Sequence, residues 1–344
     1  MKLIKKIERV KDFYLLKGEE VIATEDKVQI GSLSFNLDSK EYIFCGNDVL
    51  IKEDRRIKEN KNWKQYTYRD GKWNEDHPKY CNFQYFSENL YYSRENDKQV
   101  HLSRYSIFDN GKETLFEIKT DSGMFTPKYD KKHDLYLFLE INCQNLFFYT
   151  RDLKFLWKYQ TEAPDIDIKF NDITIVGDVV IIVRIKHIEG VFDYTYSVVA
   201  YNILTGQKLW SNEELDFAPS FHVGINNMLY SACQANGPFF IETVNPNDGT
   251  LTEYKISSDF PYSEAYIPRR STALYGNKLY FSIERKKKGL SSIGVVNLDT
   301  MTIEEKVELD TYDEGVCLSK APIVTEDRVY VFIPLLEELH IFER

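Results

Sequence analysis

Side chains that could carry out chemistry are few in this sequence, and they do not gather into a recognisable site. The six histidines are isolated from one another, and none has the spacing that metal ligands need. The nucleophile elbow, the P-loop and the dinucleotide-binding glycine motif are missing from the sequence. Asp165–Asp167 and Asn245–Gly249 could be mistaken for calcium loops, but both are more typical of turns or solvated loops. The sequence therefore predicts no catalytic residue, no metal site and no cofactor, and it favours a binding protein over an enzyme.

Aromatic and basic side chains mark several long segments between predicted strands, at residues 52–62, 184–194, 257–270 and 285–290. Aromatic residues and arginine are the types that dominate protein–protein interfaces. The basic run 285–288 by itself is also typical of a solvated turn. The residues that we expect to bind a partner are Arg55, Arg56, Trp63, Phe260, Tyr262, Tyr266, Arg269, Arg270 and Arg285.

The charge of the chain narrows the class of partner. The 344 residues carry a formal net charge of −10, with acidic and basic residues interspersed. A nucleic-acid backbone would be repelled by such a protein. Met1–Val10 returns to charged residues too early for a signal peptide, and no apolar run reaches the roughly 18 residues of a membrane span. We expect a cytoplasmic protein that binds neither nucleic acid nor a membrane.

The elements that must position the candidate residues follow a repeat. Turn residues followed by an apolar strand recur roughly every 40 to 50 residues, which is the period of a four-stranded propeller blade. In residues 278–284, apolar Leu279, Phe281 and Ile283 share one face of the predicted strand. No segment has the sustained 3.6-residue period of an amphipathic helix. These patterns predict an all-β protein built from repeated antiparallel sheets.

The best-formed copy of a second hairpin runs from Ser197 to Trp210. Its Asn202 can close a turn through its side chain, and Thr205-Gly206 supplies the tight reversal. The order Ala200, Asn202, Thr205, Gly206, Trp210 resembles the repeat of PQQ-like (quinoprotein-type) β-propellers, although Asn202 stands where that family has an acidic residue. The resemblance implies a propeller in which the tryptophan docks between neighbouring blades. Trp73 and Trp157 hold similar positions in their copies.

The repeats predict how the propeller is assembled. Strong signals give seven blades, and the strand-like segments in residues 13–35 could form an eighth, abbreviated blade. Residues 3–10 are expected to pair with the C-terminal strand at 338–342, which would close the ring and remove its exposed edge. One closed ring makes residues 1–344 a single domain.

Function in a propeller is carried by loops, because the strands are committed to packing. We expect a non-catalytic protein that binds a protein partner through the loops between second and third strands and those between blades. An immunity-type or scaffold protein of bacteria, whose acidic face masks a basic toxin or effector, is the more specific expectation. The alternative is an enzyme or sensor that takes a carbohydrate or other small molecule in the central funnel, near Asp165, Asp167 and Glu264.

Overall fold

The structure is a computed structural model of the whole chain, and it describes most of it. Between residues 37 and 128 only the backbones of the strands are described, without their side chains. The segments outside the description are 17, 37–40, 46–47, 53–64, 70–71, 77–83, 88–89, 97–98, 107–110, 120–124, 141–143, 153, 188–193, 216–218, 234–238, 257–264, 268–270, 286–288 and 310–319.

Residues 13–161 form one compact unit, which contains four antiparallel sheets of four strands each. In every sheet the strands lie side by side in chain order. The strands are β2 (Asp12–Leu16), β3 (Glu19–Ala23), β4 (Lys27–Ile30) and β5 (Leu33–Asn36); β6 (Glu41–Cys45), β7 (Asp48–Lys52), β8 (Gln65–Arg69) and β9 (Lys72–Asp76); β10 (Gln84–Ser87), β11 (Leu90–Asn96), β12 (Gln99–Ser106) and β13 (Gly111–Lys119); and β14 (Phe125–Asp130), β15 (Leu135–Glu140), β16 (Asn145–Thr150) and β17 (Phe155–Gln160).

A second compact unit joins residues 1–12 to residues 162–344 and contains four further sheets. In the third of these, β26 and β27 both pair with β28, so its first strand is interrupted. The strands are β18 (Ile166–Val176), β19 (Val179–His187), β20 (Tyr194–Asn202) and β21 (Lys208–Leu215); β22 (His222–Val223), β23 (Leu229–Cys233), β24 (Phe240–Val244) and β25 (Leu251–Lys255); β26 (Ala265–Tyr266), β27 (Thr272–Tyr275), β28 (Lys278–Arg285), β29 (Gly289–Asn297) and β30 (Thr302–Glu308); and β31 (Ile323–Val324), β32 (Arg328–Ile333), β33 (Glu338–Glu343) and β1 (Lys2–Ile7).

The described chain therefore holds eight sheets, which is the alternative blade count that the sequence left open. The additional sheet is β2–β5, from residues 12–36, and its strands have only four or five residues each. Such short strands carry too few alternating positions to give a strong repeat signal.

The expectation of a single domain over residues 1–344 stays a prediction. No helix in the described residues is long and apolar enough to cross a membrane.

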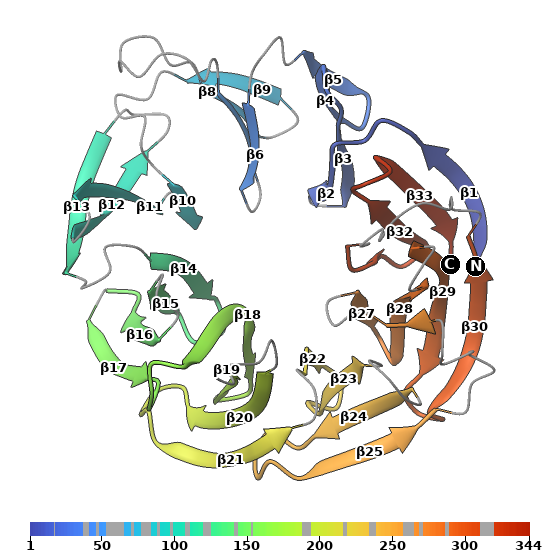
Figure 1. Cartoon of the computed structure of the whole chain (residues 1–344). Helices are drawn as coiled ribbons and strands as arrows, with labels where there is room; N and C mark the ends of the chain where they lie inside the picture. Colours follow the sequence, from blue (N-terminus) through green and yellow to red (C-terminus); the bar gives the residue numbers. More distant parts are fainter. Residues whose placement is uncertain are drawn as a thin grey trace. The chain divides into compact units, whose positions relative to one another are not determined.

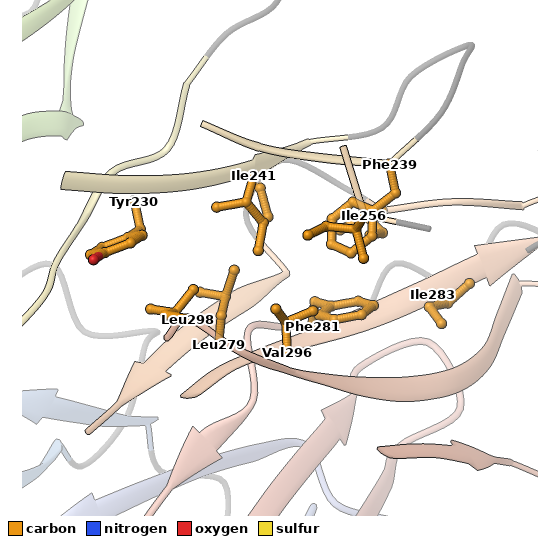
Figure 2. Packing of buried hydrophobic residues seen from close by; sticks show 11 residues of the cluster. Tyr230, Phe239, Ile241, Ile256, Leu279, Phe281, Ile283, Val296 and Leu298 are labelled. Carbon is orange, nitrogen blue, oxygen red and sulfur yellow. The ribbon is translucent and has the colours of Figure 1, made fainter. Parts of the chain in front are cut away.

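Alternation within the strands builds the core between neighbouring sheets of the second unit. Apolar residues of β23 and β24, among them Tyr230 and Ile241, face Leu279 and Phe281 of β28 (Figure 2). Phe239 meets Phe281 with ring centroids 5.0 Å apart. The other face of β28 contributes Tyr280 to the next core, against β32 and β33. The sheet that contains β28 thus buries both of its faces, which is how propeller blades pack.

Trp210 confirms the docking that the repeat implied. This residue of β21 is buried, and its indole Nε1 donates a 2.7 Å hydrogen bond to the carbonyl of Pro246 in the next sheet. Its ring lies against Gly249, where an added Cβ would come within 2.7 Å of it. Trp157 stacks on Phe148 of its own sheet, with centroids 3.9 Å apart, and the side chain of Trp73 lies outside the described residues.

Asparagine closes the turn before the fourth strand in successive sheets. The Oδ1 atom of Asn202 accepts hydrogen bonds from the backbone N–H groups of Leu204 and Thr205, at 3.1 and 2.9 Å. In the next sheet Asn245 accepts in the same way from Asn247, at 3.0 Å, so the stretch Asn245–Gly249 is a turn as predicted. The amide oxygen of asparagine thus closes the turn at the position where the PQQ-like repeat usually has an acidic residue.

The last sheet takes its fourth strand from the start of the chain. β1 is antiparallel to β33, with Lys2 opposite Glu343, Lys6 opposite His340 and Ile7 opposite Leu339. Figure 1 shows the two termini next to each other there. The predicted pairing of the N-terminal segment with the C-terminal strand is confirmed.

Candidate functional site

The structure reaches only two of the predicted partner-binding residues. Tyr266 is the last residue of β26 and pairs with Glu284, and Arg285 is the last residue of β28 and pairs with Ala265. Both were expected in loops, but backbone pairing continues to these positions, so they lie in strands at one end of the same sheet. The remaining candidates, which stay predictions outside the described residues, are Arg55, Arg56, Trp63, Phe260, Tyr262, Arg269 and Arg270.

The predicted loop 184–194 is also shorter than expected. β19 continues to His187 and β20 begins at Tyr194, with His187 and Tyr194 paired across the two strands. Arg184 is therefore a strand residue, opposite Ile168 on one side and Ser197 on the other. At this end of the β18–β21 sheet the second and third strands are joined and the chain arrives from the preceding sheet. Several charged and polar side chains form hydrogen bonds with one another there.

A buried guanidinium is the centre of this group, which we call the Arg184 cluster: Arg184, Ser197, Glu162 and Glu213. The side chain of Arg184 is only 3% exposed. Its Nη2 binds both carboxylate oxygens of Glu213, at 2.6 and 2.7 Å, and its Nη1 binds Glu162 at 3.1 Å. Its Nε donates to the hydroxyl of Ser197 at 2.8 Å. A buried cation requires such partners, because removing its charge from water without them is costly.

The two carboxylates of the cluster remain accessible to solvent. Glu162 is 64% exposed and Glu213 is 58% exposed, although both are bound to the buried guanidinium. Glu162 precedes β18 and Glu213 lies in β21. The cluster therefore links the segment that leads into the sheet to the outer strand of the sheet. Arg184 therefore holds two exposed acidic groups in defined positions at this end of the sheet.

The opposite face of the same sheet end carries an aspartate, a histidine and a tyrosine. Nε2 of His187 lies 3.0 Å from Oδ2 of Asp167, and the imidazole meets the Tyr194 ring edge-on, with centroids 5.0 Å apart. His187 and Tyr194 are both exposed. Alternation along β19 places His187 on the other face from Arg184, so a molecule that crosses the end of the sheet would meet both groups. The arrangement can accept hydrogen bonds, attract cations and offer aromatic surface.

A second polar pair links the first strands of two neighbouring sheets. Nε2 of His222 in β22 lies 2.7 Å from the hydroxyl of Thr272 in β27. Burial lowers the pKa of His222, because it disfavours the charged imidazolium. His222 is therefore suited to hold the sheets together as a neutral hydrogen-bonding group.

Within the described residues, no three histidine, cysteine or acidic side chains come together in a way that could hold a metal ion.

The sequence predicts part of this sheet end but not its centre. Asp165, Asp167 and Glu264 are acidic candidates in the sequence. The structure places Asp167 in the group with His187, whereas Glu264 lies outside the described residues. Arg184 carried a usable signal, since it is a charged residue within the apolar run Val179–Ile185. Glu162 and Glu213 carried none, because they meet Arg184 from positions 22 and 29 residues away in the chain.

Comparison with known proteins supports the fold. No protein family model matches the chain, and no curated protein matches it. BamB from Moraxella catarrhalis superposes with a TM-score of 0.57 at 12% identity, covering 99% of both chains. Sqt1 from Saccharomyces cerevisiae superposes with a TM-score of 0.53 at 9% identity, covering 100% of this chain and 99% of its own.

A structure from a study of two prolyl endopeptidases also superposes, with a TM-score of 0.52 at 11% identity. It is matched over 88% of this chain but over only 49% of its own length. At such low sequence identities, a structural superposition supports a shared architecture and gives no information on activity. Together with the eight antiparallel sheets of the described residues, seven of four strands and one of five, it identifies the chain as an all-β protein with the propeller repeat fold.

Proposed function

We propose that this protein is a non-catalytic β-propeller that binds a protein partner at the end of its sheets where second and third strands are joined. The observation that carries the proposal is the Arg184 cluster, in which a buried cation holds the exposed carboxylates of Glu162 and Glu213. Preorganised side chains lose little conformational freedom on binding, so more of their interaction energy is available for affinity. Tyr194 adds exposed aromatic surface of the kind that dominates interfaces.

The charge of the protein supports a basic partner. A net charge of −10 steers basic proteins toward this chain, and the two fixed carboxylates give such a partner a defined place to dock. In its most specific form, the proposal is an immunity-type or scaffold protein in the bacterial cytoplasm that masks a toxin or effector. The blades would then be of the PQQ-like type, for which the Trp210 contact and the Asn202 turn are the support.

Binding can be tested by co-purification with matched variants. Tagged wild-type protein, a Glu162→Gln/Tyr194→Ala variant and a control with Glu253→Gln/Tyr254→Ala would be expressed in the native host. The control changes an exposed glutamate and an exposed tyrosine of the outer strand β25. We expect one basic protein to accompany the wild type and the control, and to be reduced about tenfold with the site variant. Equal recovery with all three, or no partner with any, would contradict the proposal.

A small-molecule site is the second candidate function, and the pair Asp167 and His187 is the observation that favours it. A carboxylate that orients an imidazole is a common arrangement for proton transfer. A thermal-shift screen with sugars and metal ions tests this candidate, because a ligand that binds only the folded protein raises its apparent stability. The shift should disappear in an Asp167→Asn variant, and a shift that persists there would place the ligand elsewhere.

A further inference from the structure

The fourth strand of the last sheet is held differently from the fourth strands of the other sheets in its unit. β21, β25 and β30 each follow their neighbouring strand through a short turn, so the turn keeps them in place. β1 pairs with β33 although more than 300 residues of chain separate the two strands, since Ile7 lies opposite Leu339. If β1 separates from β33, no turn between the two strands brings it back.

The six residues of β1 contribute little side-chain burial to its attachment, although Met1 directly before the strand packs against the core between β29, β32 and β33. None of its six residues is buried, and Leu3 and Ile4 are exposed. Besides the backbone hydrogen bonds of the ladder, β1 is held by charges: Lys6 lies 2.6 Å from Glu338, and the Met1 amino group pairs with Glu305. Partly exposed ion pairs of this kind contribute little stability and weaken in salt.

A strained hinge joins β1 to the rest of the chain. Arg9 has a φ of 60°, in the left-handed region that non-glycine residues avoid. Val10 directly after it is fully buried, and its backbone N–H donates to the carbonyl of Glu337 at 2.7 Å. The chain is thus fixed from Val10 onward, and rotation about Glu8 and Arg9 would swing β1 away from β33.

We propose that two copies of this chain exchange their N-terminal strands, so that β1 of each copy pairs with β33 of the other. The exchanged pair makes the same strand contacts as the single chain, and their energies therefore cancel. What differs is the hinge, since Arg9 can leave its left-handed conformation when β1 extends toward a second copy. Complementary charge directs the exchange, because β1 carries Lys2, Lys5 and Lys6 while β33 carries Glu338 and Glu343.

A mixed disulfide experiment tests the exchange directly. Lys2 and Glu343 face each other across the two strands, and both are exposed, so cysteines there should not disturb the core. A Lys2→Cys chain is mixed with a Glu343→Cys chain at high concentration and moderate salt, and then oxidised. We expect a dimer in which mass spectrometry finds residue 2 of one chain linked to residue 343 of the other.

Two controls make the outcome decisive. A chain with both substitutions should form the same link internally when dilute, which shows that the cysteines can react. If that link forms but the mixture gives no linked peptide between chains, the exchange is refuted. Arg9→Gly removes the strain of the closed hinge and should lower the fraction of exchanged dimer about fivefold for each of the two hinges. Arg9→Ala keeps a side chain at this position and should leave the dimer fraction near the wild-type value. An equal dimer fraction in both variants would refute the role of the hinge.

Discussion

At Arg184 a buried positive charge and two exposed negative charges depend on one another. The guanidinium is tolerated in the sheet because Glu213 binds it through both carboxylate oxygens and Glu162 and Ser197 satisfy further donors. The carboxylates in turn are held close to the sheet although they are mostly solvated. The same side chains therefore contribute to stability and to the proposed recognition. A substitution in the Arg184 cluster should be tested for its effect on both.

Replacing Glu213 should cost stability, because it leaves the buried guanidinium with a weaker set of partners. We expect Glu213→Gln to lower the free energy of unfolding by about 1–3 kcal/mol, measured by urea denaturation. Glu308→Gln is the control, since Glu308 is also 58% exposed but pairs with the exposed Lys306. That change should cost less than about 1 kcal/mol. Equal losses would mean that Arg184 does not depend on Glu213.

Glu338 should make stability depend on acidity. Burial raises the pKa of this carboxyl, but hydrogen bonds from Lys6 and His340 outweigh burial, so its pKa is lowered in the folded protein. A lowered pKa adds stability above the pKa of the unfolded chain, and this stability is lost as the pH falls through the folded value. We expect Glu338→Gln to flatten the decrease in unfolding free energy below about pH 5. An unchanged pH profile would argue against the network.

At the scale of the elements, turns and one tryptophan set the spacing between sheets. The turn of residues 245–249 is shaped by Asn245 and by Gly249, which has a φ of 75°. It also forms the surface on which Trp210 of the preceding sheet rests. The same local structure thus reverses the chain and joins two sheets.

Gly249→Ala should therefore be more harmful than an ordinary glycine substitution in a turn. It adds a Cβ within 2.7 Å of the Trp210 ring as well as the strain of a positive φ. Gly276→Ala provides the comparison, because Gly276 has a φ of 62° but no atom within 4 Å of the added Cβ. We expect losses of about 2–4 kcal/mol at position 249 and about 1 kcal/mol at position 276, from thermal or denaturant unfolding. Similar losses at both positions would mean that the ring moves aside without cost.

At the scale of the whole molecule, the two compact units are interlocked in sequence. Residues 13–161 are inserted between the two segments, 1–12 and 162–344, that make up the other unit. Strand β1 completes a sheet of the second unit before the chain enters the first. The sheet that contains β1 is therefore not complete until β31, β32 and β33 have been made.

The single-domain prediction implies one cooperative unfolding transition. We expect denaturation curves followed by far-ultraviolet circular dichroism and by tryptophan fluorescence to coincide, because neither unit should unfold alone. Trp157 and Trp210 report on the first and the second unit, so Trp157→Phe and Trp210→Phe variants can assign any difference. Two separate transitions would show that the chain folds as two domains.

Local sequence determined the sheets of this protein. Strand alternation, turn asparagines such as Asn202 and the recurrence of the hairpins predict an all-β propeller because they act over a few residues. The pairing of residues 3–10 with the last strand also followed, since a terminal strand without a neighbour needs one. The eighth sheet was harder to see, because β2–β5 are short.

Only the tertiary structure decided which polar side chains meet. Glu162 and Glu213 reach Arg184 because strand register brings distant positions to one end of a sheet, and nothing in their local sequence encodes that register. Burial of the guanidinium likewise depends on how the chain packs around it and not on the residues beside it in sequence. The strands could be predicted from the sequence because their patterns are local. The site could not, because it is made of contacts between strands.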